Sequence, residues 1–151
     1  MEPTTPPSDD SCVFCAIVAG TQPASIVTRD ALTVTFVDLR QFHPGHVLVI
    51  PRVHVSDIRA ANDATVTAVA IATARAARAV DHAFPGDGLS VWHSAGEGAN
   101  QEVPHLHVHI HPRRFSDKLL DVYPRAPTLP SRAALEEVAQ QLRAAMEFLT
   151  D

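Results

Sequence analysis

Four histidines alternate with apolar residues in the segment His105-Leu106-His107-Val108-His109-Ile110-His111. Successive side chains of a β-strand point to opposite faces, so this spacing predicts four imidazoles on one face and a buried apolar face behind them. Neighbouring histidines that were all charged would repel one another, so some must stay neutral near pH 7. A row of neutral and charged imidazoles places a nucleophile or base beside a proton donor, which suits stepwise group transfer.

The spacing alone leaves other interpretations open. Four imidazoles spread over roughly 20 Å of strand cannot share one metal ion, whose nitrogen ligands lie at about 2.1 Å, but adjacent pairs could bind one. A metal-binding strand is therefore the functional alternative. A half-exposed strand whose polar face consists of imidazoles is the structural alternative.

Composition narrows the class of protein. The 151 residues are 46% apolar, which suits one domain with one core. The 12 basic and 17 acidic residues give a net charge of −5, which argues against a nucleic-acid-coating protein but allows a small phosphate-bearing ligand. We expect no membrane span, because the chain contains no apolar run of about 18 residues. With no secretory signal visible and only two cysteines, we expect a reducing, cytoplasmic location.

The periodicity of apolar residues predicts an α+β fold with an antiparallel sheet of about five strands. We expect residues 1–10, rich in Pro, Ser, Thr and Asp, to be a disordered tail, and residues 11–151 to form a single domain. Ser11 is the expected N-cap of a short helix closed by Gly20, and Asn62 that of a long Ala-rich helix. The predicted helices are 12–19, 63–83 and 131–149, and the predicted strands are 25–29, 32–37, 46–50, 89–93 and 103–111.

Three separate motifs lie in order along the chain, at residues 12–20, 38–54 and 101–113, and the last contains the alternating histidines. Together they resemble the histidine triad (HIT) superfamily of nucleotide hydrolases and transferases over about residues 11–115. The resemblance implies a HIT-like fold and an enzyme that cleaves a nucleoside phosphate at its α-phosphorus without a catalytic cofactor. Dinucleoside polyphosphates and nucleoside phosphoramidates are the implied substrates. A non-catalytic nucleotide-binding module of the same fold is the alternative.

The resemblance also implies roles for individual residues. His107 is the implied nucleophile, which forms a covalent nucleotidyl-histidine, and His109 contacts the phosphate and helps the leaving group depart. His46 and His105 complete the implied catalytic set. The implied substrate-binding residues are Asp38 (to the ribose), Ser94, Gln101, Glu102 and Val103. His111 stands where the family usually has an apolar residue. We expect it at a solvated strand end, and a fourth polar contact is the alternative.

Cys12 and Cys15 form a C-x2-C pair, which by itself fits a redox pair, half of a zinc site or two buried thiols. The resemblance implies a structural zinc ion held by both cysteines together with His54 and His105. Such a Cys2His2 set is closed and tetrahedral, so it leaves no ligand position for substrate. Relatives commonly pair through the long helix and a continued sheet, so a homodimer is the expected assembly.

Overall fold

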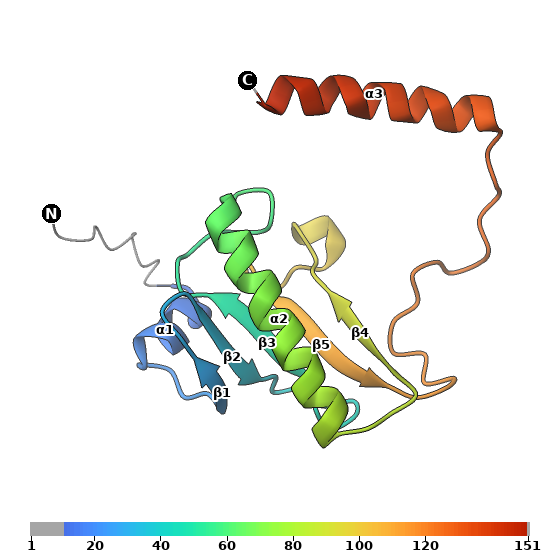
Figure 1. Cartoon of the computed structure of the whole chain (residues 1–151). Coiled ribbons are helices and arrows are strands. Elements are labelled where there is room, and N and C mark those ends of the chain that lie inside the picture. Colours follow the sequence, from blue (N-terminus) through green and yellow to red (C-terminus); the bar gives the residue numbers. More distant parts are fainter. Residues whose placement is uncertain (1–10, 151) are drawn as a thin grey trace, which may run out of the picture. The chain divides into compact units, whose positions relative to one another are not determined.

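The structure is a computed structural model that describes residues 11–150, so the tail expected at residues 1–10 lies outside the described part. The chain divides into two compact units, Met1–Leu119 and Leu120–Asp151. The first unit contains α1 (Val13–Ala19), α2 (Asp63–Ala83) and the sheet, and the second contains α3 (Arg132–Thr150) (Figure 1). The expectation of a single domain over residues 11–151 stays a prediction.

The strands of the described residues form one antiparallel sheet in the order β1-β2-β3-β5-β4. Their bounds are β1 (Ile26–Arg29), β2 (Thr33–Val37), β3 (Val47–Pro51), β4 (Gly88–Trp92) and β5 (Val108–Arg113). β5, which carries part of the histidine run, therefore lies inside the sheet, and its His109 pairs with Leu48 on one side and Trp92 on the other. The predicted α+β class with about five antiparallel strands is confirmed.

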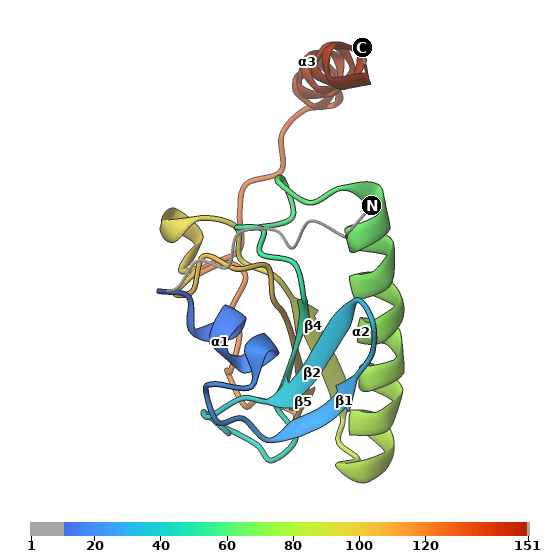
Figure 2. The same cartoon turned by 90° about the vertical axis from the view of Figure 1, so that its left-hand side faces the viewer.

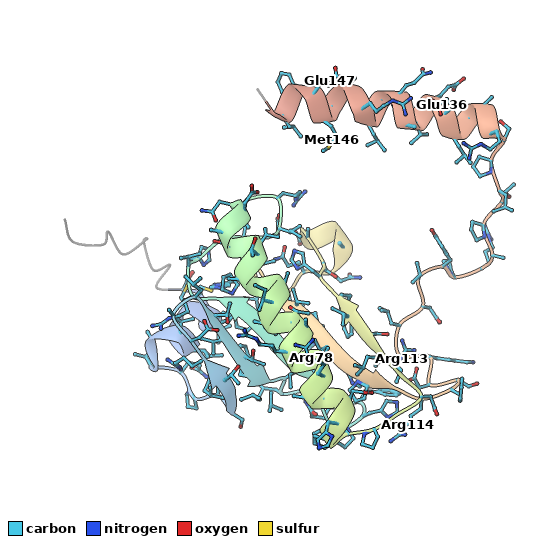
Figure 3. All side chains as sticks on the ribbon, in the orientation of Figure 1. Arg78, Arg113, Arg114, Glu136, Met146 and Glu147 are labelled. Carbon is cyan, nitrogen blue, oxygen red and sulfur yellow. The ribbon has the colours of Figure 1, made fainter. Side chains whose placement is uncertain are left out.

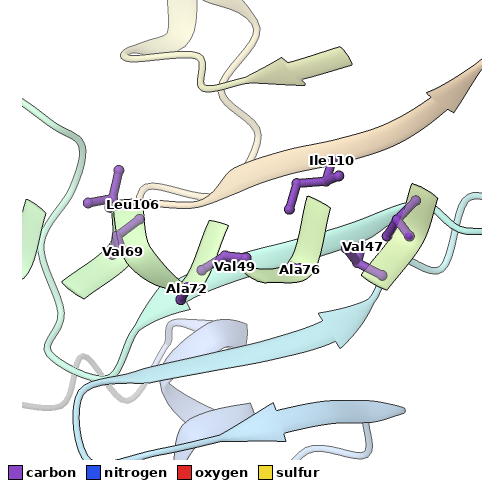
Figure 4. Packing of buried hydrophobic residues seen from close by; sticks show 8 residues of the cluster. Val47, Val49, Val69, Ala72, Ala76, Leu106 and Ile110 are labelled. Carbon is purple, nitrogen blue, oxygen red and sulfur yellow. The ribbon is translucent and has the colours of Figure 1, made fainter. Parts of the chain in front are cut away.

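Helices cover both faces of the sheet. Figure 2 shows α2 against one face and α1 on the opposite side. The α2 face is a buried apolar cluster (Figure 4) whose members are Val47, Val49, Val69, Ala72, Ala76, Val80, Leu106 and Ile110. The α1 face is a second cluster, made of Cys12, Phe14, Ile17, Val34, Phe36, Leu48 and Ile50. Leu106 and Ile110 thus point toward α2, and the histidines between them are left to the other face.

The predicted caps at Asn62 and Gly20 are confirmed. The Asn62 side chain caps α2 by accepting from the Thr65 N–H at 2.9 Å, and Gly20 closes α1 in the left-handed conformation. The expected Ser11 cap is wrong, because α1 begins one residue later than predicted. Cys12 is its N-cap, with Sγ accepting from the Cys15 N–H at 3.4 Å.

The strand predicted over residues 103–111 is wrong at both ends. β5 begins only at Val108, because the Leu106 N–H donates to the Val55 carbonyl at 2.7 Å instead of joining the ladder. It continues to Arg113, because pairing with β4 extends to that residue. His105 and His107 therefore precede the strand, although the division of side chains between the two faces persists.

α3 is amphipathic within its own unit. The Ser131 hydroxyl accepts from the Ala134 N–H at 3.2 Å at its start, as the predicted boundary requires. Figure 3 shows Met146 and Glu147 on different sides of the helix, and the exposed apolar residues Leu135, Val138, Leu142 and Met146 recur at helical spacing. Among the described residues, no helix is long and apolar enough to cross a membrane.

We predict that Ile110→Ala lowers the free energy of unfolding by about 2–5 kcal/mol, because it leaves a cavity between β5 and α2. Ile110 is fully buried. The control is Ile71→Ala on α2, whose side chain is 48% exposed and whose loss should cost less than about 1 kcal/mol. Urea denaturation monitored by circular dichroism measures both values. Equal losses in the two variants would contradict this account of the core.

Candidate active site and metal cluster

The His107 ring is buried against α1 and has one nitrogen engaged. Its Nδ1 lies 2.7 Å from the His105 carbonyl oxygen, which can only accept, so Nδ1 carries the proton. In the neutral ring Nε2 is then the unprotonated nitrogen with a free lone pair. The Phe14 ring stands edge-on at 5.2 Å and His93 donates from Nδ1 to the His107 carbonyl at 2.9 Å. These contacts hold a neutral imidazole in the tautomer that a nucleophile requires.

His46 and His109 form a pair of hydrogen-bonded imidazoles beside His107. His46 Nδ1 donates to the Arg40 carbonyl at 2.9 Å, so His46 Nε2 is free to accept. His109 Nδ1 lies 3.0 Å from that nitrogen, and the His107 and His109 ring centroids are 5.0 Å apart. The structure thus brings together three of the four predicted catalytic histidines as a chain of rings that ends on a backbone carbonyl.

Burial sets the protonation states of His107 and His109. Desolvation is the largest effect on both, and it lowers the pKa of His107 and lowers the pKa of His109 to about 4. The neighbouring imidazole of His107 lowers the pKa of His109 further, whereas the Asp38 carboxylate acts in the opposite direction. Both rings are therefore neutral at pH 7 in the free protein, and an anion bound beside them would favour the charged forms.

Asp38 is buried beside His46. Its Oδ1 accepts from the Arg40 N–H at 2.7 Å, and its Oδ2 lies 3.8 Å from His46 Nε2. Asp38, His46 and His109 could also each offer one atom to a metal ion. The direct 3.0 Å contact between the two imidazoles uses the nitrogens such an ion would need, so the geometry favours a proton relay.

The loop between β4 and β5 is folded around Gln101. Its side chain accepts from the Gly96 N–H at 2.7 Å and donates to the carbonyls of Ser56 and Val103 at 2.6 and 3.1 Å. Ser94 is half-buried just after β4, and the Val103 side chain packs against the α1 cluster. The Gln101 amide therefore ties Gly96 and Val103 of this loop to Ser56.

Sequence reasoning missed two contacts around the histidines, and the first is an ion pair between loops. Arg40 forms a two-pronged pair with Glu102, with both N–O distances at 3.0 Å. Arg40 follows β2 and Glu102 precedes β5, so the pair joins the two loops that flank the histidines. Nothing in the local sequence of either loop indicates this partner.

The second missed contact is made by Trp92. Its indole is stacked on His109, with ring centroids 4.5 Å apart and planes 2° from parallel. It also lies 5.7 Å from the His46 ring. The register that places Trp92 opposite His109 is the signal that could have revealed it, and a sequence alone does not give a register.

The expectation that His111 is solvated is wrong, because its side chain is 1% exposed. The rings of His43 and His46 cover it at 5.7 and 4.7 Å, and its Nδ1 donates to the Pro112 carbonyl at 2.7 Å. Next to this group, Asp117 accepts from Arg113 at 3.0 Å and contacts His43 Nε2 at 3.1 Å, and Arg113 is labelled at the end of β5 in Figure 3. The buried His111 at the end of the row therefore lies next to the Arg113–Asp117 ion pair.

Cys12, Cys15, His54 and His105 form the second cluster, with their possible ligand atoms all within 4.8 Å of one another. His105 Nδ1 lies 3.5 Å from Cys12 Sγ and 3.6 Å from Cys15 Sγ, and His54 Nδ1 lies 3.2 Å from Cys15 Sγ. Zinc–sulfur bonds of about 2.3 Å and zinc–nitrogen bonds of about 2.1 Å separate tetrahedral S and N ligands by about 3.6 Å. The cluster therefore fits one zinc ion.

The ring of His105 is prepared for such an ion. Its Nε2 donates to the Pro51 carbonyl at 2.9 Å, which leaves Nδ1 unprotonated and facing the thiols, as in zinc sites with a second-shell acceptor. Burial lowers the pKa of His105 to about 4, so the ring is neutral at pH 7. Neutral imidazole is the form that binds zinc.

Residues 19–116 match the HIT domain family. The chain is 36% identical over 104 residues to Protein hit of Bacillus subtilis, covering 69% of this chain and 72% of the relative. It is 29% identical over 136 residues to an adenosine 5′-monophosphoramidase of Schizosaccharomyces pombe, covering 88% and 99%. An adenylylsulfatase of Arabidopsis thaliana is 29% identical over 110 residues, covering 73% of this chain and 56% of the relative.

Solved structures agree with the sequence comparison. A crystal structure of a Streptococcus mutans protein superposes with a TM-score of 0.85 at 32% identity, covering 97% of this chain and 95% of that one. A zinc-bound histidine triad family protein from Mycobacterium smegmatis has a TM-score of 0.67 at 39% identity, covering 93% and 96%. The family match spans the whole described sheet and the alternating histidines, and solved structures agree with the fold, so this protein belongs to the HIT domain family.

Proposed function

We propose that the protein is a nucleotide hydrolase or nucleotidyl transferase that acts at the α-phosphorus of nucleoside phosphate conjugates through a covalent nucleotidyl-histidine on His107. One observation carries this proposal. The hydrogen bond from His107 Nδ1 to the His105 carbonyl leaves Nε2 as a neutral nucleophile beside a second imidazole. That combination turns one difficult displacement at phosphorus into two easier ones.

In the first step His107 Nε2 bonds to phosphorus while the bond to the leaving group breaks. The His105 carbonyl stabilises the positive charge that develops on the His107 ring, because it already accepts from Nδ1. The anionic phosphate raises the proton affinity of His109, so His109 Nε2 takes up a proton from solvent as the substrate binds and then donates it to the leaving group. His46 accepts from His109 Nδ1 throughout. Water or another acceptor releases the nucleotide in the second step.

The surrounding residues fit a nucleoside phosphate. Asp38 would offer carboxylate oxygens to the ribose hydroxyls, and the loop that contains Gln101 and Val103 would supply backbone N–H groups to the phosphate oxygens. Glu102 would repel a phosphate, but its pairing with Arg40 offsets that charge. Ser94 lies at the start of the same loop. The names of the yeast and plant relatives, a phosphoramidase and an adenylylsulfatase, support an adenylyl group as the transferred part and leave the leaving group open.

We predict that His107→Ala lowers the rate of nucleoside monophosphate release by at least about 10³-fold, because no other group replaces the nucleophile. His82→Ala, an exposed position near the end of α2, is the matched control and should keep wild-type activity. Product release is measured with adenosine 5′-phosphoramidate and with a dinucleoside polyphosphate.

Mass spectrometry of the acid-stopped wild-type reaction should show one added nucleotidyl group on a peptide that contains His107. Normal turnover by folded His107→Ala would contradict the assignment. Tight nucleotide binding without any adduct would instead identify a non-catalytic binding module.

We also propose that Cys12, Cys15, His54 and His105 bind a structural zinc ion. When bound, zinc would supply four strong bonds that join α1 to the segments after β3 and before β5. The distances of the cluster support this role, as does the zinc-bound Mycobacterium smegmatis relative. A site with four protein ligands is closed, which is typical of structural zinc. Its thiolate ligands suit a reducing compartment, which supports a cytoplasmic location.

We predict that purified wild-type protein contains about one zinc ion per chain and that Cys15→Ser or His54→Ala lowers both the zinc content and the unfolding temperature. Atomic absorption and calorimetry measure the two quantities, and His82→Ala is the control. Chelated protein that stays folded should still form the nucleotidyl adduct. Loss of adduct formation, restored by added zinc, would contradict a purely structural role.

We propose a homodimer formed through α2 and β4. β4 is an edge strand, which leaves one side of its backbone available for pairing. Beside it lies an almost wholly apolar groove of about 340 Å³, lined by Ile58, Val66, Val69, Ala70, Thr73, Ala74, Ala77, Val91, His93, Leu106 and Val108. A second copy would continue the sheet and cover this apolar surface.

We predict that light scattering gives twice the mass of a single 16.3 kDa chain. Ala74→Glu puts a charge into the groove and should shift the protein to monomer, because an unpaired charge is costly to bury. Ala64→Glu, exposed at the start of α2 and outside the groove, is the matched control. A wild-type monomer at all concentrations would contradict the dimer.

A further inference from the structure

Trp92 is the last residue of β4 and lies directly opposite His109 in the antiparallel register. Opposed residues project to the same face with about 4.5–5.5 Å between their Cβ atoms, so the indole and the imidazole must meet. The 2° angle between the two ring planes shows that they meet face to face. Because the indole also stacks on His46, one flat side chain contacts both rings of the His46–His109 hydrogen bond.

The orientation of the His109 ring decides where its proton can go. The terminal torsion of an imidazole is broad, so a single hydrogen bond defines its ring plane only loosely. The bond from Nδ1 to His46 Nε2 at 3.0 Å requires one orientation, which directs Nε2 away from His46. His107 lies at an interplanar angle of 64° to this ring and offers no parallel surface. Trp92 supplies the flat contact that fixes the plane.

We propose that Trp92 is a positioning residue for His109, holding the ring plane in which Nδ1 bonds to His46 and Nε2 faces the leaving group. This role rests on the proposed function, in which His109 delivers the proton. As the His107–phosphorus bond forms, the bond to the leaving atom breaks, its electron pair stays on that atom, and the proton moves there from His109 Nε2.

The indole also affects the charge that His109 must carry. Three groups oppose a positive charge on this ring, namely His107, His46 and Arg40. Asp38 favours that charge. An aromatic face attracts a cation that lies over it, so Trp92 acts in the same direction as Asp38. An aliphatic residue at position 92 would remove this attraction together with the flat contact.

Two substrates with different leaving groups distinguish a loss of proton delivery from a general loss of packing at the site. Single-turnover formation of the nucleotidyl-enzyme is measured with an alkylamine nucleoside 5′-phosphoramidate, whose amine must be protonated to leave, and with a nucleoside 5′-(4-nitrophenyl) phosphate, whose phenolate need not be. We expect Trp92→Leu to slow the amine substrate about tenfold and the nitrophenyl substrate less than about twofold. Trp92→Phe keeps a flat ring and should stay within about threefold of wild type on both.

Equal slowing of both substrates by Trp92→Leu, or no slowing of either, would overturn the proposal. Failure of Trp92→Phe to rescue the amine substrate would also overturn it. A wild-type enzyme that forms no nucleotidyl-histidine with either substrate would contradict the proposed function instead. Circular dichroism and thermal unfolding of each variant confirm that the comparison is made between folded proteins.

Fluorescence tests the same contact without turnover, because Trp92 is the single tryptophan of the chain. A protonated imidazole in contact quenches indole emission more strongly than a neutral one does. We expect emission of the wild type to fall as the pH is lowered toward the pKa of His109, about 4, over the range in which circular dichroism is constant. His109→Gln should remove most of this fall. An equal fall in His109→Gln would overturn the proposal.

Discussion

The site depends on one constraint, which is that alternate side chains of residues 105–111 point to opposite faces of the sheet. Leu106 and Ile110 are buried against α2, and this burial forces His107 and His109 to the opposite face of the sheet. A shift of one residue would place imidazoles in the apolar cluster and leucine and isoleucine at the site, so the register is strongly specified. The hydrophobic core thus positions the histidine face, although none of its side chains belongs to that face.

Burying a row of imidazoles has an energetic cost that the backbone offsets. Each buried ring would lose hydrogen bonds to water, and the carbonyls of His105, Arg40, Pro51 and Pro112 each accept from one of them. These bonds also select the tautomer, because a carbonyl can only accept a proton. The backbone contacts that stabilise the buried histidines are therefore the same contacts that leave Nε2 of neutral His107 unprotonated.

Much of this arrangement could be predicted from the sequence, because side-chain alternation and helix capping depend only on neighbouring residues. Strict alternation predicted the two faces, and the Asn62 and Gly20 signals predicted helix ends. Predictions failed where distant segments decide. β5 starts late because Leu106 bonds to a residue from another loop, and His111 is buried under rings from the loop before β3. The stack of Trp92 needed the register between two strands, and spacing within one strand cannot supply it.

His105 connects the two clusters in a way that neither motif alone suggests. Its side chain belongs to the cluster with Cys12, Cys15 and His54 that could hold a metal ion, whereas its carbonyl oxygen accepts the hydrogen bond that fixes the His107 tautomer. Bonds made to the His105 ring restrain its backbone as well, because only two torsions separate the ring from the Cα atom. The segment lies before β5 and lacks ladder hydrogen bonds of its own. The contacts of the His105 ring with Cys12, Cys15 and the Pro51 carbonyl therefore hold this segment, and with it the carbonyl beside His107, where the sheet does not.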